Sequence, residues 1–453
     1  MNDEFLIIQP SPSSLVQSLR DIGYSMESAV ADVIDNSITA GAKNIQIHFS
    51  WNEGDPWLSV VDDGKGMSAP ELTSAMRLGS RNPLEERDQE DLGRFGLGLK
   101  TASFSQARQL TLISKKNSEL ACRQWDLDLI EDDPASGWRL LVLQERALMK
   151  DIITAQLLNM IEKQGTVVLL RKLDRYDGLE KKLNAQIDFT RKHLELVFHR
   201  YLSPERGRRK VNIYLNNDPL IAFNPFNPLN NATQELPEQT IYVAGHAVRV
   251  QPYVLPHYNK TSREEYERYS GEGGYLQNQG FYVYRNRRLI IKGTWFRLIA
   301  KEELTKLLRV QVDLPNALDH LWKVDVKKSH ASPPEVIRKE LRTTIERIAS
   351  SGKRVYRQRG ERLVTNVKVP GWTRTAAEGK IIYRINQEHP LAEQIRSYIP
   401  SEHQKLFNDF LLMLESTFPT ELFYSDAANN LENLENPRFD EEQMTDLLDL
   451  LGT

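Results

Sequence analysis

The sequence predicts an α+β fold in which helices cover one face of a sheet. Two observations predict it. Apolar residues recur at three- and four-residue spacing through residues 15–37, which is the period of an amphipathic helix. Short alternating or apolar runs typical of strands then follow at 45–49, 57–61, 110–114, 120–127, 138–143 and 165–170. Further helices are expected at 70–78 and 150–163, and a first domain, residues 1–175, is expected to end there.

Composition and charge are those of a globular protein. The chain has 453 residues, enough for about three domains, with 40% hydrophobic and 27% charged residues. No apolar run reaches membrane-spanning length and the N-terminus lacks a signal-peptide pattern, so no membrane contact and a cytoplasmic location are expected. The single cysteine, Cys122, excludes an intrachain disulfide and a cysteine-cluster metal site. The net charge of −3 gives no overall basic field for nucleic acid.

Two polar residues mark the second N-terminal helix. Residues 23–25 are expected to divide the helical stretch, with Ser25 capping the second helix. Asp32 and Asn36 are four residues apart and therefore lie on one face, whereas Asp35 lies well round the helix. Surface helices often carry polar residues at this spacing, so the pair alone indicates no chemistry.

The strand at 57–61 runs directly into the segment Asp62-Asp63-Gly64-Lys65-Gly66-Met67. An aspartate at a strand end before Gly-x-Gly can form an Asx-type turn. It can equally place a carboxylate at the floor of a pocket, with a tight backbone bend above it. The residues themselves favour neither interpretation.

The stretch DLGRFGLGLKTAS holds Gly93, Gly96 and Gly98 within six positions. Clustered glycines let main-chain N–H groups approach phosphate oxygens, and the apolar run after Gly98 begins a helix whose first turn favours an anion. The stretch is not a P-loop, because Leu99 separates the last glycine from Lys100. Nor does a strand precede it, as a dinucleotide fingerprint requires. It predicts a phosphate-binding loop of another kind.

The rest of the chain predicts two further domains, residues 176–350 and 351–453. The first has expected helices at 186–201 and 334–349, and expected strands at 210–214, 239–243, 246–254, 280–284, 289–291, 308–314 and 324–326. Its polar stretch 257–279 is interpreted as a mobile insertion. The second has expected strands around 364–369 and 380–384, helices between 390 and 418, and an acidic helical tail. Basic clusters at 206–210, 285–288 and 353–362 are each interpreted as solvated surface, and together they keep nucleic-acid binding open.

Four pieces of the first segment occur in a fixed order: Asp32-x-x-x-Asn36, Asp62-x-Gly64-x-Gly66, Gly93-x-x-Gly96-x-Gly98 and Gly165-Thr166. In this order the chain resembles the Bergerat-fold ATPases, the GHKL superfamily of gyrase B, heat-shock chaperones, histidine kinases and MutL. The strings SLRDIGYSMESAVADVIDNSITAGA and GRFGLGLKTAS are similar to MORC-type ATPases and their bacterial relatives. YVYRNRRLI and WKVDVKKSHA extend the resemblance, less specifically, into a transducer-like (ribosomal S5-like) α/β domain.

The resemblance implies a role for each matching position. Asp62 would accept a hydrogen bond from the adenine amino group of ATP with Thr166 supporting it, and Gly66 and Met67 would line the base. Asn36 would ligate the Mg²⁺ that bridges the triphosphate. The other implied nucleotide-binding positions, most of them in a lid around the phosphates, are Gly64, Gly79, Gly93, Arg94, Phe95, Gly96, Leu97, Gly98, Leu99, Lys100 and Thr101.

The implied general base departs from the family pattern. Clamp members that hydrolyse ATP normally carry glutamate one turn before the metal-binding asparagine, and here that residue is Asp32, one methylene shorter. The attacking water must therefore lie closer, or catalysis is slow. In the transducer, Lys327 or Lys328 would reach the γ-phosphate, with Lys292 as a weaker candidate; a pair of surface lysines at a strand end is the alternative.

The function implied is an ATP-driven clamp. ATP and Mg²⁺ would order the lid and the N-terminal arm and bring two chains together as a homodimer. Slow hydrolysis would then reopen the dimer, and the partner would be DNA, in defence or DNA maintenance, or another protein. Two alternatives stay open: a chaperone-like protein-binding ATPase, and an ATP sensor with little hydrolysis. A histidine kinase is disfavoured, because no phospho-accepting histidine helix is evident.

Overall fold

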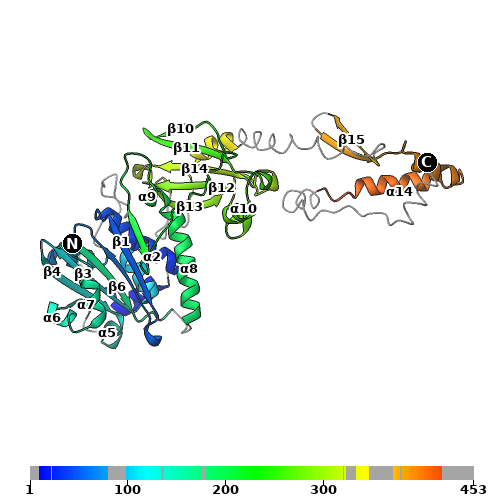
Figure 1. Ribbon diagram of the computed structural model, residues 1–453. Helices are drawn as coiled ribbons and strands as arrows, with labels where there is room; N and C mark the ends of the chain where they lie inside the picture. Colours follow the sequence, from blue (N-terminus) through cyan, green and yellow to red (C-terminus); the bar gives the residue numbers. More distant parts are fainter. Residues whose placement is uncertain are drawn as a thin grey trace, which may run out of the picture. The chain divides into compact units, whose positions relative to one another are not determined.

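The computed structural model describes residues 10–21, 23–79, 98–133, 137–175, 180–319, 321–322, 333–345, 371–377 and 380–420 (Figure 1). The chain divides into two compact units, residues 1–300 with 307–346 and residues 301–306 with 347–453. The first part of the expected N-terminal arm (residues 3–14), the strands at 324–326 and 364–369 and the acidic tail lie outside the described residues, whereas residues 12–14 begin a helix. The division into three domains stays a prediction.

The first unit contains a sheet of eight strands within the described residues, in the order β5-β4-β3-β6-β2-β1-β7-β8. The strands are β1 (Asn44–Ser50), β2 (Trp57–Asp62), β3 (Gln109–Lys116), β4 (Glu119–Asp126), β5 (Leu141–Val142), β6 (Gly165–Arg171), β7 (Asn212–Leu215) and β8 (Asp218–Pro219). Neighbours are antiparallel except β1 and β7. The strand expected at 138–143 shrinks to two residues, and the one expected at 210–214 is β7, which joins this sheet.

Helices α1 (Pro12–Arg20), α2 (Met26–Thr39), α3 (Ala69–Met76), α4 (Gly98–Gln106), α5 (Leu127–Asp132) and α8 (Glu180–Val197) contribute to the main core on one face of the sheet. Val30, Val33 and Ile34 of α2 belong to this core with alternate residues of β1, such as Ile45 and Ile47. Burial of this apolar stripe is what holds α2 across the sheet. Ser25 occupies the N-cap of α2, as expected, although its hydroxyl donates to Ser28 Oγ and accepts no capping hydrogen bond from a backbone N–H.

Helices also cover the opposite face, so the expectation of a single helical face is wrong. Val167 and Leu169 of β6 belong to a second core with Leu148 of α6 (Glu145–Leu148) and Leu157 of α7 (Ile152–Leu158). Because β6 is apolar at successive positions, both of its faces must be shielded from water. The predicted helix at 150–163 is accordingly present as the shorter α7.

A second sheet follows in the same unit, with order β10-β11-β14-β12-β13 and β9 beside β11. Its strands are β9 (Gln234–Glu235), β10 (Gln239–Val243), β11 (His246–Val254), β12 (Gly280–Arg285), β13 (Arg288–Thr294) and β14 (Leu308–Leu314). The strands expected between 239 and 314 are therefore confirmed, and residues 335–345 are helical. The stretch 257–279, which was expected as a mobile insertion, contains α10 (Arg263–Ser270) and α11 (Gly274–Asn278).

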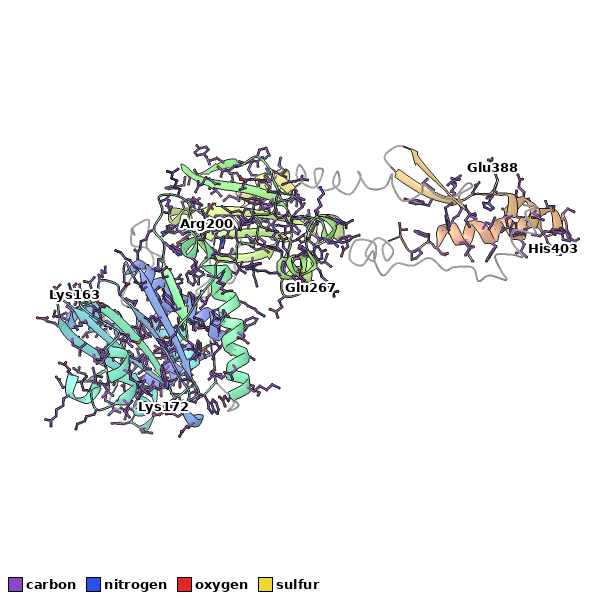
Figure 2. All side chains as sticks on the ribbon, in the orientation of Figure 1. Lys163, Lys172, Arg200, Glu267, Glu388 and His403 are labelled. Atoms are coloured by element: carbon purple, nitrogen blue, oxygen red, sulfur yellow. The ribbon has the colours of Figure 1, made fainter. Side chains whose placement is uncertain are left out.

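Helix α9 (His199–Leu202) links the two sheets of the first unit by a largely buried ion pair. Its Arg200, labelled in Figure 2, places Nη1 2.5 Å from Asp313 Oδ1 on β14.

Short 3₁₀ turns occur at Asn52–Gly54, Tyr258–Lys260, Glu303–Thr305 and Asn316–Leu318.

The second unit contains an antiparallel hairpin and two helices among its described residues. The hairpin pairs β15 (Trp372–Ala377) with β16 (Lys380–Ile385), and only β16 was expected from the sequence. The expected helical region is divided into α13 (Pro390–Tyr398) and α14 (Gln404–Ser416). Across the described parts of both units, the helices are too short or too polar to span a membrane.

Candidate active site

Helix α2 carries the two polar residues expected on one face. Asn36 Nδ2 donates to the backbone oxygen of Asp32 at 2.9 Å, which holds the Asn36 side chain against the preceding turn of the helix. Asn36 is exposed, whereas only 4% of Asp32 is accessible to solvent. The helix therefore presents an amide to solvent beside a buried carboxylate.

Asp62 lies at the end of β2 and is 5% exposed. Ser37 Oγ, on the next residue of α2 after Asn36, donates to its Oδ2 at 2.8 Å, and Gly64 N donates to its Oδ1 at 2.9 Å. Burial raises the pKa of Asp62 to about 6, although these two hydrogen bonds favour the charged form and act in the opposite direction. The bond from Gly64 closes an Asx-type turn, so the turn and the buried carboxylate occur together.

The turn after Asp62 has no room for side chains. A Cβ on Gly64 would lie 2.8 Å from Asp62 Oδ1 and 2.9 Å from Ala40 Cβ, at the end of α2. Gly66 has φ +64°, and a Cβ there would lie 2.1 Å from the Lys115 carbonyl oxygen of β3. The tight bend expected after Asp62 is therefore present, and it packs closely against the end of α2 on one side and β3 on the other.

Gly66→Ala is expected to lower the free energy of unfolding much more than Gly245→Ala. Both glycines have positive φ, +64° and +80°, so alanine costs about 1–2 kcal/mol at either position for the backbone conformation alone. Only Gly66 adds the backbone clash, because a Cβ on Gly245 would meet no atom within 4 Å. Urea unfolding of the two variants measures the difference, and equal losses would contradict the close packing at Gly66.

A serine that was not predicted from the sequence connects β3 to β6 and to the turn after Asp62 by hydrogen bonds. Ser114 of β3 is fully buried, and its Oγ accepts from Met67 N at 2.8 Å and donates to Gly165 O at 3.0 Å. The Thr166 hydroxyl lies 3.0 Å from the same Oγ, and Thr166 is paired with Asp62 across β2 and β6. Met67, Thr166 and Asp62 are thus brought together as predicted. The only signal in the sequence is a hydroxyl at the end of an apolar strand.

The first turn of α4 lies beside Asp32. A Cβ on Gly98 would lie 3.7 Å from Asp32 Oδ2. Lys100 Nζ donates to the Ala75 carbonyl near the end of α3 at 2.9 Å, and Thr101 Oγ1 donates to Gly98 O at 3.3 Å. The start of α4, with its N–H groups, is therefore placed next to the carboxylate predicted as general base.

Several predicted positions do not enter this arrangement. Gly79, with φ +66°, follows α3, and no described atom would lie within 4 Å of a Cβ there. Leu99 is half-buried and packs against the main core. The predicted residues Gly93, Arg94, Phe95, Gly96, Leu97, Lys327 and Lys328 lie outside the described residues.

Asp32 contacts two side chains that the sequence did not single out. Tyr24 donates its hydroxyl to Asp32 Oδ2 at 3.1 Å, and Arg288 Nη2 lies 3.4 Å from Asp32 Oδ1. Arg288 comes from β13 of the second sheet and is 5% exposed. The interpretation of cluster 285–288 as solvated surface is therefore wrong for Arg288, and also for Arg285, which is buried against Asp319.

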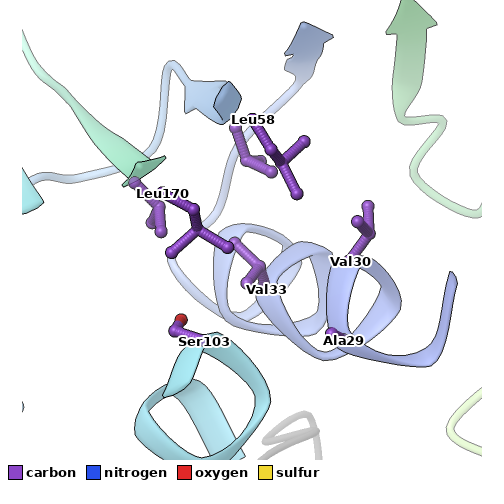
Figure 3. Close-up of a pocket in the computed structure, with 8 residues that line it drawn as sticks. Ala29, Val30, Val33, Leu58, Ser103 and Leu170 are labelled. Atoms are coloured by element: carbon purple, nitrogen blue, oxygen red, sulfur yellow. The ribbon is translucent and has the colours of Figure 1, made fainter. Parts of the chain in front are cut away.

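A small cavity on the core side of α2 is separate from this site (Figure 3). Its lining residues come from α2, α4 and strands β2 and β6, and they are Ala29, Val30, Val33, Leu58, Val60, Ser103, Val168 and Leu170. The Ser103 hydroxyl has no hydrogen-bond partner among the described residues. A cavity with apolar walls inside the core is a packing defect rather than a polar ligand site.

Residues 24–156 match the family described as histidine kinase-, DNA gyrase B- and HSP90-like ATPases. The match includes Asp32, Asn36 and Asp62 and ends before Thr166. The N-terminal region of the chain is therefore a GHKL ATPase domain, and such a domain implies ATP hydrolysis.

Distant relatives match over the same part of the molecule. ATPase morc-1 of Caenorhabditis elegans is 33% identical over 90 residues, 20% of this chain and 10% of the relative. DNA mismatch repair protein MutL of Dictyoglomus turgidum is 33% identical over 94 residues, 20% of this chain and 16% of the relative. MORC family CW-type zinc finger protein 1 of Homo sapiens is 29% identical over 111 residues, 24% of this chain and 11% of the relative. The chain thus spans between 10% and 16% of the length of these relatives.

Proposed function

We propose that this chain is an ATP-driven clamp that binds Mg²⁺ and ATP at the site built on α2, dimerises in the ATP state and hydrolyses ATP slowly. One observation carries the proposal. A single helix holds Asp32 and Asn36 and, through Ser37, fixes the carboxylate of Asp62. The residues proposed as general base, metal ligand and adenine acceptor therefore all belong to α2 or are hydrogen-bonded to it.

Asp62 is suited to recognise adenine. Its desolvated carboxylate accepts hydrogen bonds, and the adenine amino group donates them. Gly64 and Gly66 let the turn pack closely against Asp62, Ala40 and Lys115, and we propose that the base lies against the backbone of this turn. Thr166 and Met67 complete this subsite through their shared contact with Ser114.

Asn36 suits a magnesium ion bound with a triphosphate. Its Nδ2 is committed to the Asp32 carbonyl, so Oδ1, the oxygen that a hard cation prefers, is the atom it presents from an exposed position. Asn36 would thereby hold a Mg²⁺ ion that supplies positive charge against the triphosphate. Gly98, Leu99, Lys100 and Thr101 at the start of α4 would add backbone N–H groups and a positive charge, and we propose the same for the glycine-rich residues before them.

Asp32 would accept the proton of the attacking water. Its reach is shorter than that of glutamate, and each of its oxygens already receives a donor, Tyr24 on one and Arg288 on the other. Water must compete with these donors, so we expect slow turnover. The same contacts favour a second candidate function, an ATP sensor that hydrolyses little.

The second sheet is proposed as the transducer. It shares ion pairs with α2 through Arg288 and with α9 through Arg200, which gives it a physical link to the nucleotide site. Lys327 or Lys328 would report the γ-phosphate. DNA is the proposed partner, because one relative is named a DNA mismatch repair protein and residues 206–210 are exposed and basic. Retention on DNA that falls steeply with salt would support this partner.

Light scattering with Mg²⁺ and a non-hydrolysable ATP analogue tests the clamp. The wild-type chain is expected to change from the mass of one chain to the mass of two, and Asn36→Ala to stay at one because it does not bind the Mg²⁺ complex. Omitting Mg²⁺ is expected to have the same effect as this substitution. A chain that is dimeric without nucleotide, or one that binds the analogue without a change in mass, would contradict ATP-driven dimerisation.

A further inference from the structure

The β12–β13 hairpin carries an arginine from the second sheet to the middle of α2. Arg288 Nε lies 2.8 Å from Asp35 Oδ1 and 2.7 Å from Asp35 Oδ2, and its Nη2 lies 3.4 Å from Asp32 Oδ1. The three side chains are 6%, 2% and 4% exposed, in the order Arg288, Asp35 and Asp32. One guanidinium thus contacts two buried carboxylates of one helix.

The two contacts differ in strength. Buried carboxylates are costly without a cation, and the short contacts show that Asp35 is the main partner of Arg288. The contact with Asp32 is longer and uses the outer nitrogen of the same planar fork. His193 of α8 interacts electrostatically with Arg288 but adds no second cation, because desolvation lowers the pKa of its imidazole to about 3. Asp35 therefore anchors the guanidinium, and the orientation of the fork sets the contact with Asp32.

We propose that Arg288 is a positioning residue that couples the second sheet to the general base. Arg288 holds Asp32 Oδ1 while Tyr24 holds Oδ2, so these two donors fix the plane of the carboxylate next to the start of α4. Tyr24 belongs to the ATPase domain, but Arg288 belongs to the second sheet. A shift of β13 along α2 weakens the 3.4 Å contact of Arg288 with Asp32 before it weakens the shorter contact with Asp35. The position of the second sheet therefore changes the orientation of the Asp32 carboxylate. This inference rests on the proposed role of Asp32.

Arg288→Gln is the test, with ATP affinity and steady-state turnover measured separately. ATP affinity is expected to stay within about twofold, because Asp62 and Asn36 keep their contacts, whereas kcat falls about tenfold as the base loses its orientation. Arg288→Lys is expected to give an intermediate kcat, because a single ammonium pairs with Asp35 but lacks the fork that also reaches Asp32.

Arg285→Gln is the matched control on the same hairpin. Arg285 Nε lies 2.9 Å and 2.7 Å from the two oxygens of Asp319, with side chains 5% and 11% exposed. Its loss breaks a buried pair of the same kind in the same sheet, so a similar drop in Tm is expected, with kcat within about twofold of wild type. Equal losses of kcat in the two variants would overturn the proposal, as would an unchanged kcat in Arg288→Gln.

Two further variants keep the test decisive. Should Arg288→Gln fail to fold, the double variant Arg288→Gln with Asp35→Asn replaces the ion pair by two neutral amides, and the same loss of kcat is expected of it. Asp32→Asn, measured alongside, separates the two proposals. Turnover that survives Asp32→Asn refutes the base assignment itself. Turnover that Asp32→Asn stops and Arg288→Gln leaves unchanged refutes only the coupling.

Discussion

Asp32→Asn is expected to bind ATP with wild-type affinity and to hydrolyse it at least about 100-fold more slowly, the usual scale of a lost general base. Asparagine has the same shape: its oxygen can accept from Arg288, and its amino group can donate to the Tyr24 hydroxyl, so the residue keeps both neighbours. It cannot take a proton from water. Calorimetry measures the binding, and release of phosphate measures the turnover.

Glu27→Gln is the matched control for Asp32→Asn. Glu27 lies in the first turn of the same helix, where it accepts from Gln186 Nε2 at 3.2 Å, and it is the alternative carboxylate for the base. Turnover close to wild type is expected of this variant. If Glu27→Gln stops hydrolysis and Asp32→Asn does not, the general base is Glu27 and not Asp32.

Asp62→Asn is expected to weaken ATP binding by about 100-fold, the scale of a lost hydrogen bond to a buried charged group. Asparagine can turn either its oxygen or its amino group towards the nucleobase. The variant is therefore also expected to lose the preference for ATP over GTP, since the guanine carbonyl oxygen meets repulsion only from the carboxylate. Competition of ATP and GTP for both proteins measures this preference. An unchanged preference for ATP over GTP would mean that the adenine ring does not bind at Asp62.

The pKa of Asp62, raised to about 6 by burial, predicts opposite effects of pH on binding and on stability. Below pH 6 the carboxyl becomes protonated, so ATP affinity is expected to fall between pH 7.5 and 5.5, and Asp62→Asn to lack this part of the dependence. A folded pKa above the unfolded value of 3.8 stabilises the protein fully below pH 3.8, and this contribution is lost as the pH rises through 6. Asp62→Asn is therefore expected to have a higher Tm than wild type at pH 8. A lower Tm there would contradict the assigned burial.

The parts of the fold that depend on local pattern could be predicted from the sequence. Apolar spacing and Ser25 predicted α2, whereas the aspartate at the end of a strand left a turn and a buried carboxylate equally open, and only the resemblance favoured the carboxylate. Contacts between distant segments could not be predicted. Arg288 lies 253 positions from Asp35, in a run of arginines whose composition is typical of surface. Which of those arginines turns inward is decided by the register of the β12–β13 hairpin, which composition does not contain.

Within one site, Asp62 is proposed to bind ATP and Asp32 to act as the base that hydrolyses it. The most direct test measures ATP affinity and phosphate release on the same preparations of wild type, Asp62→Asn and Asp32→Asn. The expected pattern is a split: wild type binds and hydrolyses, Asp62→Asn loses affinity, and Asp32→Asn keeps affinity and loses hydrolysis. Wild-type protein that binds no ATP, or two variants that keep both properties, would contradict it.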